Sequence, residues 1–213
     1  MAYTKEGFLG PFKGRIGKVV FYEMYGKTVG RSLPSVKRKP AKGALKESQN
    51  DFARVMKIMQ KVKPFVRLGF KDMAEGRSAF HTALSENLKR YRLAENREEL
   101  TWLCVSKGER AGALDLTLNI EGKVATVSWG EPEPRRPFAP NDRVMLLAFN
   151  PATIDSNYDL HAATRAEGTA TLILPPAKEE ENMLVFISFL NATGMGDKKN
   201  LKNISDSQLV GLD

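Results

Sequence analysis

Cysteine is almost absent from this chain of 213 residues, because it occurs only once, at Cys104. A single cysteine excludes an intrachain disulfide framework. Long apolar runs are also missing, since no stretch approaches the ~18 consecutive apolar residues that a transmembrane helix needs. The opening segment, MAYTKEGFLGPFKGR, lacks the apolar core of a secretory signal. We therefore expect a cytoplasmic protein without a membrane partner.

Phosphate-binding and metal-binding motifs are missing as well. A P-loop requires Ser or Thr after its Gly-Lys pair, whereas Gly17-Lys18 is followed by Val19. The segment Asp155–Asp159 (DSNYD) opens like a calcium loop. The sixth and twelfth positions of that loop hold Leu160 and Ala166 instead of Gly and Glu. We expect no cofactor and no bound metal.

Candidates for nucleophilic or acid–base chemistry are few. Cys104 lies in the apolar run Trp102–Val105, which favours buried packing over a reactive thiol. His81 has no Cys, Asp or second His nearby at ligand spacing, and His161 is far from Cys104 in the sequence. No pair of carboxylates stands at a spacing that implies acid–base catalysis. These absences lead us to expect a protein without enzymatic activity.

The charge that is present is unevenly distributed. The formal net charge of +8 divides into +13 for residues 1–98, with 22 Lys+Arg and 9 Asp+Glu, and −5 for residues 99–213, with 11 and 16. We therefore predict two modules with these bounds. Such modules have different partners or attract each other, within one copy or between copies.

The N-terminal region is rich in glycine and predicts a β-hairpin. Residues 17–23 and 27–32 are extended runs that flank the turn signal Tyr25-Gly26. The segment Val19–Tyr22 is apolar on both faces, and an isolated two-stranded hairpin is not stable in water. These side chains must therefore be covered by the rest of the fold or by another copy. Beyond the hairpin, the basic run Lys37–Lys39 lies in a connector bounded by prolines.

A helical pair is predicted next. The first helix covers about residues 47–63 and ends before Pro64. The second follows Gly76, with Ser78 as its N-cap, and an apolar connector, residues 65–70, joins the two. The expected apolar stripes are Phe52, Val55, Met56, Met59 and Val62, and Phe80, Leu84, Leu88 and Tyr91.

After residue 98 the pattern changes to alternating strands and turns. Six or seven short strands are expected at residues 114–120, 124–129, 144–149, 158–164, 168–174, 183–191 and 207–211. This spacing is typical of an antiparallel β-sandwich. The predicted fold class is therefore α+β: an N-terminal β-hairpin and helical pair, then a sandwich. The residues expected in its core are Val20, Tyr22, Phe52, Met56, Leu84, Leu88, Trp129, Leu146 and Phe186.

Two resemblances accompany these patterns. The segments GKVATVSW (122–129) and TATLILP (169–175) resemble strands of fibronectin type III-like or immunoglobulin-like domains, with Trp129 as the core tryptophan and Leu172 as the inward leucine. The usual core tyrosine of the penultimate strand is absent, and Phe186 or Phe189 fills its volume. The whole chain resembles an uncharacterised family of Bacteroidetes proteins, a domain of unknown function. That resemblance rests on Gly14-x-x-Gly17-Lys18, the segment around Gly26 to Pro34, and Ser48-Gln49-x-x-Phe52.

Three functions remain open from the sequence. The first is a non-enzymatic structural or assembly protein that associates with itself, of which a virion- or tail-like component is one case. The alternative is a nucleic-acid-binding module that uses the basic residues 1–98. The third is a sandwich that binds a ligand or partner through loops 131–141 and 192–204. The residues expected to bind a partner are Arg31, Lys37, Arg38 and Lys39.

Overall fold

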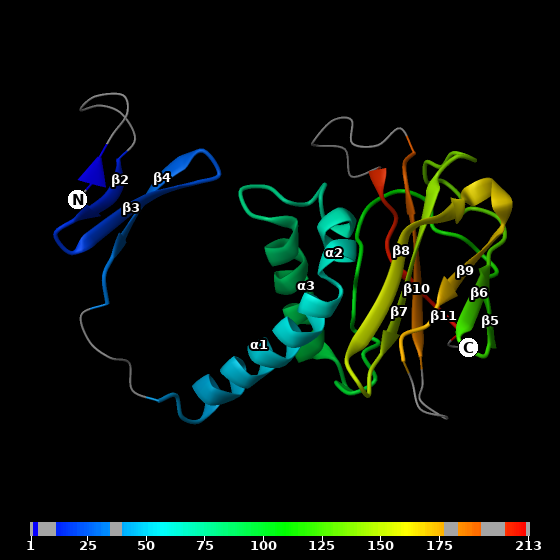
Figure 1. Cartoon of the computed structure of the whole chain (residues 1–213), viewed down its shortest axis with the longest axis horizontal. Helices are drawn as coiled ribbons and strands as arrows, with labels where there is room; N and C mark the ends of the chain where they lie inside the picture. The colour runs from blue at the N-terminus through cyan, green and yellow to red at the C-terminus, as the bar shows by residue number, and fades with distance from the viewer. Residues whose placement is uncertain (1, 4–11, 35–39, 177–182, 193–202, 212–213) are drawn as a thin grey trace. The chain divides into compact units, whose positions relative to one another are not determined.

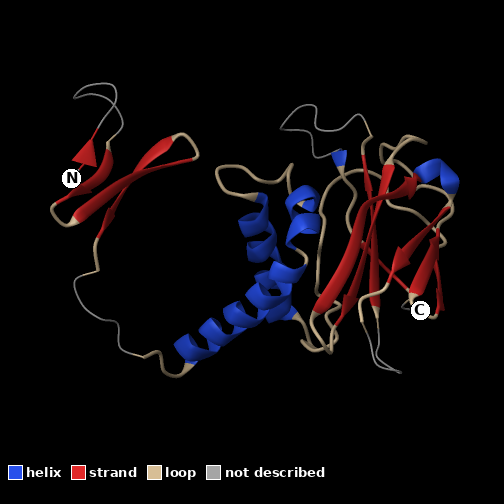
Figure 2. Cartoon of the chain, in the orientation of Figure 1, coloured by secondary structure: helices blue, strands red, loops and turns tan. Residues whose placement is uncertain are grey.

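The structure is a computed structural model that describes residues 2–3, 12–34, 40–176, 183–192 and 203–211. The chain divides into two compact units, Met1–Glu47 and Ser48–Asp213. Helices and antiparallel sheets together form a mixed α+β fold, as predicted (Figure 2).

The first unit contains a four-stranded antiparallel sheet in which each strand pairs with the next along the chain. Its strands are β1 (Ala2–Tyr3), β2 (Lys13–Ile16), β3 (Val19–Met24) and β4 (Lys27–Ser32). The predicted hairpin is confirmed as β3–β4, with Met24 opposite Lys27 at the turn. Strands β1 and β2 extend this hairpin and were not expected.

The second unit begins with three helices, α1 (Ala44–Lys61), α2 (Lys63–Gly69) and α3 (Ala79–Leu93). The Ser78 hydroxyl accepts a hydrogen bond from the backbone N–H of His81 at 3.2 Å, which confirms the expected N-cap. Residues 65–70 were expected as a connector, but most of them lie in α2. Pro64 is tolerated there because it occupies the first turn, where backbone N–H groups have no helical partner.

Two antiparallel sheets complete the second unit. One has the order β5-β6-β9 and the other β11-β10-β7-β8 (Figure 1). The seven predicted strands correspond to these elements, whose bounds are β5 (Thr117–Glu121), β6 (Val124–Ser128), β7 (Arg143–Asn150), β8 (Asp155–Thr164), β9 (Thr169–Ile173), β10 (Leu184–Leu190) and β11 (Gln208–Val210).

The four-stranded sheet β11-β10-β7-β8 is the middle layer of the second unit. Successive side chains of a strand point to opposite faces. Met145, Leu147 and Phe149 therefore join the cluster with the helices, whereas Leu146 and Ala148 join the cluster shared with β5-β6-β9. The expected boundary between residues 98 and 99 falls inside this unit, because the helices share one core with the sheet.

Of the nine expected core residues, four are buried, three are half-buried and two are exposed. Leu84, Trp129, Leu146 and Phe186 are buried, whereas Val20, Met56 and Leu88 are half-buried. Tyr22 is 38% exposed, because the described sheet of the first unit buries none of its side chains. Phe52 is 43% exposed, since the buried stripe of α1 begins one turn later, at Val55, and continues through Ile58 and Met59.

Candidate interaction surfaces

The sheet of the first unit has one apolar face. Strand pairing places Ile16 opposite Val19, and Phe21 opposite Gly30. The Phe21 ring lies against Gly30, where an added Cβ would come within 3.0 Å of the ring, and its centroid is 6.2 Å from that of Phe12. None of the described side chains of residues 12–34 is buried, and Ile16 is 52% exposed. On this apolar face, formed by Phe12, Ile16, Val19 and Phe21, Ile16 is exposed and the other three side chains are half-buried, so none of the four is fully covered.

The opposite face of the same sheet is basic. Arg15 and Arg31 both pair with Val20, one on each side, so the three side chains form one row across the sheet. Tyr22, Met24 and Lys27 share this basic face. The predicted partner-binding residue Arg31 is exposed here, whereas Lys37, Arg38 and Lys39 lie outside the described residues.

An ion pair joins Lys13 and Glu23, which lie on the two central strands of the sheet. The Lys13 ammonium lies 2.7 Å from the Glu23 carboxylate. Its hydrogen bond and charge hold the pKa of Glu23 below the ordinary value. Because the charges of Lys13 and Glu23 neutralise each other, the cations of the described strands that have no nearby opposite charge are those on the basic face.

The net charge is distributed differently when it is counted for the two compact units instead of for residues 1–98 and 99–213. Residues 1–47 contain 11 Lys+Arg and 3 Asp+Glu, a net charge of +8, and residues 48–213 contain 22 of each. The basic helical region and the acidic sheet region of the sequence neutralise each other within the second unit, for example through Lys61 and Asp155 at 2.9 Å. The first unit therefore carries the whole net charge.

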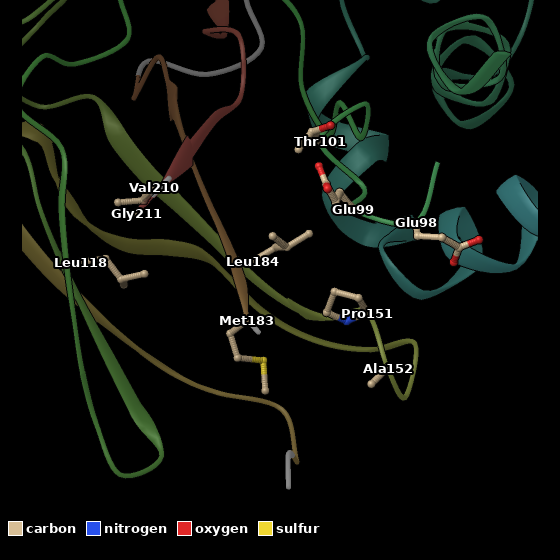
Figure 3. Close-up of a pocket in the computed structure, with 10 residues that line it drawn as sticks. All are labelled: Glu98, Glu99, Thr101, Leu118, Pro151, Ala152, Met183, Leu184, Val210 and Gly211. Carbon is tan, nitrogen blue, oxygen red and sulfur yellow. The ribbon is translucent and has the colours of Figure 1, made fainter. Parts of the chain in front are cut away.

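A cavity of about 690 Å³ lies in the second unit, at the ends of β10 and β11 and beside the β7–β8 turn. Figure 3 shows Glu99 and Thr101 on one side of it, and Leu118, Val210 and Gly211 on the other. Its remaining apolar lining comes from Pro151, Ala152, Met183 and Leu184. Its volume is within the range of small-molecule pockets, about 300–1,000 Å³.

Two carboxylates lie among the residues that line this cavity, and one of them, Glu99, is in no ion pair of the described residues. Glu98 is bound to the guanidinium of Arg54, whose hydrogen bond and charge lower the pKa of Glu98. Glu99 accepts a hydrogen bond from the Asn96 amide at 2.5 Å, and no ion pair of the described residues involves it. An adjoining hollow of about 490 Å³ shares Glu99 and adds Glu95 and Arg90. The cavity thus offers an apolar floor and an acidic rim.

The residues considered for chemistry have structural partners. Cys104 is buried, its thiol donates to the Ser106 carbonyl at 3.2 Å, and burial raises the pKa of the thiol. His81 lies 2.6 Å from the Ser78 hydroxyl through Nδ1. Asp155, which opens the segment compared with a calcium loop, pairs with Lys61. Among the described residues, no group of three His, Cys, Asp or Glu side chains could hold a metal ion.

Sequence reasoning missed a buried ionic cluster. Both Arg110 and Arg165 bind the fully buried carboxylate of Asp142, Arg110 through Nε at 2.8 Å and Arg165 through Nε at 3.3 Å. Arg165 also donates to the Gly112 carbonyl at 2.9 Å and stacks 3.6 Å above the ring centroid of Phe189. All three charges are buried, so each depends on the others for its neutralisation, and loss of one partner would leave the remaining charges unpaired. No spacing signal connects these residues, because they come from different segments.

The chain matches one family across both compact units, over residues 11–203. It belongs to the family of unknown function DUF6266. The DUF6266 match confirms the expected membership of an uncharacterised family and supplies no activity. No curated protein and no solved structure matches the chain. The origin in Bacteroidetes and the fibronectin-like sandwich stay predictions. None of the described helices is long and apolar enough to cross a membrane.

Proposed function

We propose that this DUF6266 protein is a non-enzymatic assembly protein that associates with itself through its first unit. The supporting observation is the sheet β1–β4, in which none of the described side chains of residues 12–34 is buried. Apolar side chains that a fold leaves without full cover, as on this sheet, are candidates for an interaction surface. In this proposal the protein acts in the cytoplasm or as part of a virion-like particle.

The distribution of charge favours a contact between unlike surfaces. Two first units would bring charges of +8 together, which disfavours association through that unit alone. The second unit has no net charge and carries a cavity with an acidic rim. A contact between the first unit of one copy and the second unit of another is heterologous. Repetition of such a contact produces rings or filaments.

Size-exclusion chromatography with light scattering tests this proposal. The expected molar mass exceeds the 23.7 kDa of one chain and rises with protein concentration. A fall in molar mass at high salt would show that attraction between exposed charges contributes to the contact. A molar mass of one chain at every concentration and at low salt would refute self-association.

Nucleic-acid binding is the second candidate, and the basic face supports it. Arg15 and Arg31 flank Val20 in one row, and Tyr22 on the same face is 38% exposed. Cations beside an exposed aromatic ring suit a phosphate backbone and an unpaired base. Fluorescence anisotropy with random single-stranded and duplex DNA, read across a salt series, tests this candidate.

The salt series also tests the role of Arg31. Arg31→Ala should reduce the slope of log K against log salt by about 1, as expected for the loss of one phosphate contact. Arg77→Ala removes an exposed cation of the second unit and should leave the slope unchanged. Equal slopes for the wild type and Arg31→Ala would remove Arg31 from the binding surface.

We also propose a fibronectin III-like arrangement for the two sheets of the second unit. Labelled in chain order as A, B, C, C′, E, F and G, strands β5 to β11 group as A-B-E and C′-C-F-G, which supports this likeness. The indole N–H of Trp129 donates to the Arg165 carbonyl at 2.9 Å, and its ring packs edge-on against Phe189. An experimental structure with another strand grouping would refute the arrangement.

A further inference from the structure

The turn between β3 and β4 exposes two large apolar side chains. Met24 is 47% and Tyr25 is 52% exposed, and Lys27 is opposite Met24 in the last strand pair. We call Met24, Tyr25, Gly26 and Lys27 the hairpin tip. It combines apolar side chains with one cation at the end of a narrow two-stranded element.

The backbone of the hairpin tip is unusual for the residues it contains. Both Tyr25 (φ 53°) and Gly26 (φ 72°) have positive φ, as in two-residue hairpin loops. Asn or Asp normally precedes the glycine in such loops, because a bulky side chain adopts this conformation at a cost. Turn chemistry therefore does not account for Tyr25, and strained positions of this kind are frequent at functional sites.

The cavity of the second unit is complementary to the hairpin tip in its chemistry. Its floor includes Leu184 and Val210, and Glu99 on its rim is in no ion pair of the described residues. The volume of about 690 Å³ leaves room for more than one large side chain. The tip supplies the apolar groups and the cation that such a cavity would bind, and it belongs to the unit with a net charge of +8.

We propose that the hairpin tip of one copy inserts into the cavity of a second copy. Tyr25 and Met24 then cover the floor formed by Leu184 and Val210, and Lys27 meets the carboxylate of Glu99. This inference rests on the proposed self-association and specifies its contact. Each copy has one tip and one cavity, so the same contact adds further copies until a ring closes or a filament grows.

Two substitutions block the two sides of this contact. Tyr25→Asn removes the aromatic ring and places a residue suited to the turn, so it should weaken self-association at least tenfold without lowering the thermal midpoint. Ala152→Trp adds a large side chain at an exposed position of the cavity lining. This substitution should weaken self-association to a similar extent. Leu93→Asn is the matched control, because Leu93 is 84% exposed and belongs neither to the hairpin tip nor to the residues that line the cavity.

A mixture of the two blocked variants gives the decisive measurement by light scattering. Each variant alone should be monomeric, and the equimolar mixture should form a 1:1 dimer. In that dimer the intact tip of Ala152→Trp occupies the intact cavity of Tyr25→Asn. A mixture that stays monomeric would overturn the inference, since the blocked sides would not be complementary.

The remaining outcomes separate this inference from the proposed function. A wild-type protein that is monomeric at every concentration refutes self-association itself, and the inference fails with it. Wild-type assembly that persists in both variants leaves self-association intact and overturns the contact proposed here. Loss of assembly in Ala152→Trp but not in Tyr25→Asn would show that something other than the hairpin tip occupies the cavity. This result would also overturn the proposed contact.

Discussion

At the scale of single residues, the buried charges of Arg110, Asp142 and Arg165 depend on one another, and this dependence can be tested. Asp142→Ala leaves two buried guanidinium groups without their shared carboxylate and should lower the free energy of unfolding by about 3–5 kcal/mol. Chemical denaturation measures this loss. Arg136→Ala removes only exposed ion pairs and should cost less than about 1 kcal/mol. Equal losses in the two variants would contradict the structural role of the cluster.

The ionised carboxylate of Glu86 makes the stability of the protein depend on pH. The hydrogen bond from Lys107, at 2.7 Å, is the main cause that holds the pKa of Glu86 below its ordinary value, and Arg90 contributes. This contribution to stability is complete above the ordinary pKa of about 4.3 and is lost as the pH falls through the lowered folded-state pKa. The thermal midpoints of the wild type and Glu86→Gln should therefore differ most near neutral pH and converge in acid. A difference that grows in acid would show the opposite shift.

At the scale of elements, the docking of α1 on the sheet depends on only part of its apolar stripe. Met59 is fully buried in the cluster with the sheet, and Phe52, two turns earlier, is 43% exposed. Met59→Ala should cost about 2–5 kcal/mol of unfolding free energy, because it leaves a cavity in the core. Phe52→Ala should cost less than about 1 kcal/mol. Denaturant titrations of both variants measure these effects, and a larger loss for Phe52→Ala would mean that α1 packs through its first turns.

At the scale of the whole molecule, the second unit should fold without the first. Its two apolar clusters lie entirely between Val55 and Val210. Removal of residues 1–43 leaves 23 Lys+Arg and 23 Asp+Glu, so the net charge falls from +8 to zero. We expect the shortened chain to unfold cooperatively and to lose retention on a cation exchanger at neutral pH. Absence of a cooperative thermal transition would show that the two units fold as one.

Local patterns in the sequence determined most of the elements. Alternation and helical spacing depend on neighbouring residues, so the β3–β4 hairpin, the cap at Ser78 and the strands after residue 98 were all predictable. Strand β2 has no apolar alternation, because Ile16 is the only apolar residue in its sequence KGRI, and the sequence therefore does not predict it. Helix α2 is not predicted because Pro64 is equally compatible with the end of one helix and the first turn of the next. The apolar character of Val19–Tyr22 was also evident, and with it the expectation that another surface covers these side chains.

Only the tertiary structure decided which surfaces these elements present. Burial depends on what packs against a stripe, and this is why Phe52 is exposed although it has the spacing of Val55 and Met59. The cavity brings Glu99 beside Leu184 and Val210, residues about 85 to 110 positions apart, and no local pattern encodes such a meeting. Charge followed the same rule. The sequence showed a basic half and an acidic half. The structure places the boundary between compact units after residue 47, so residues 48–213 form one unit without net charge and residues 1–47 carry the net charge of +8.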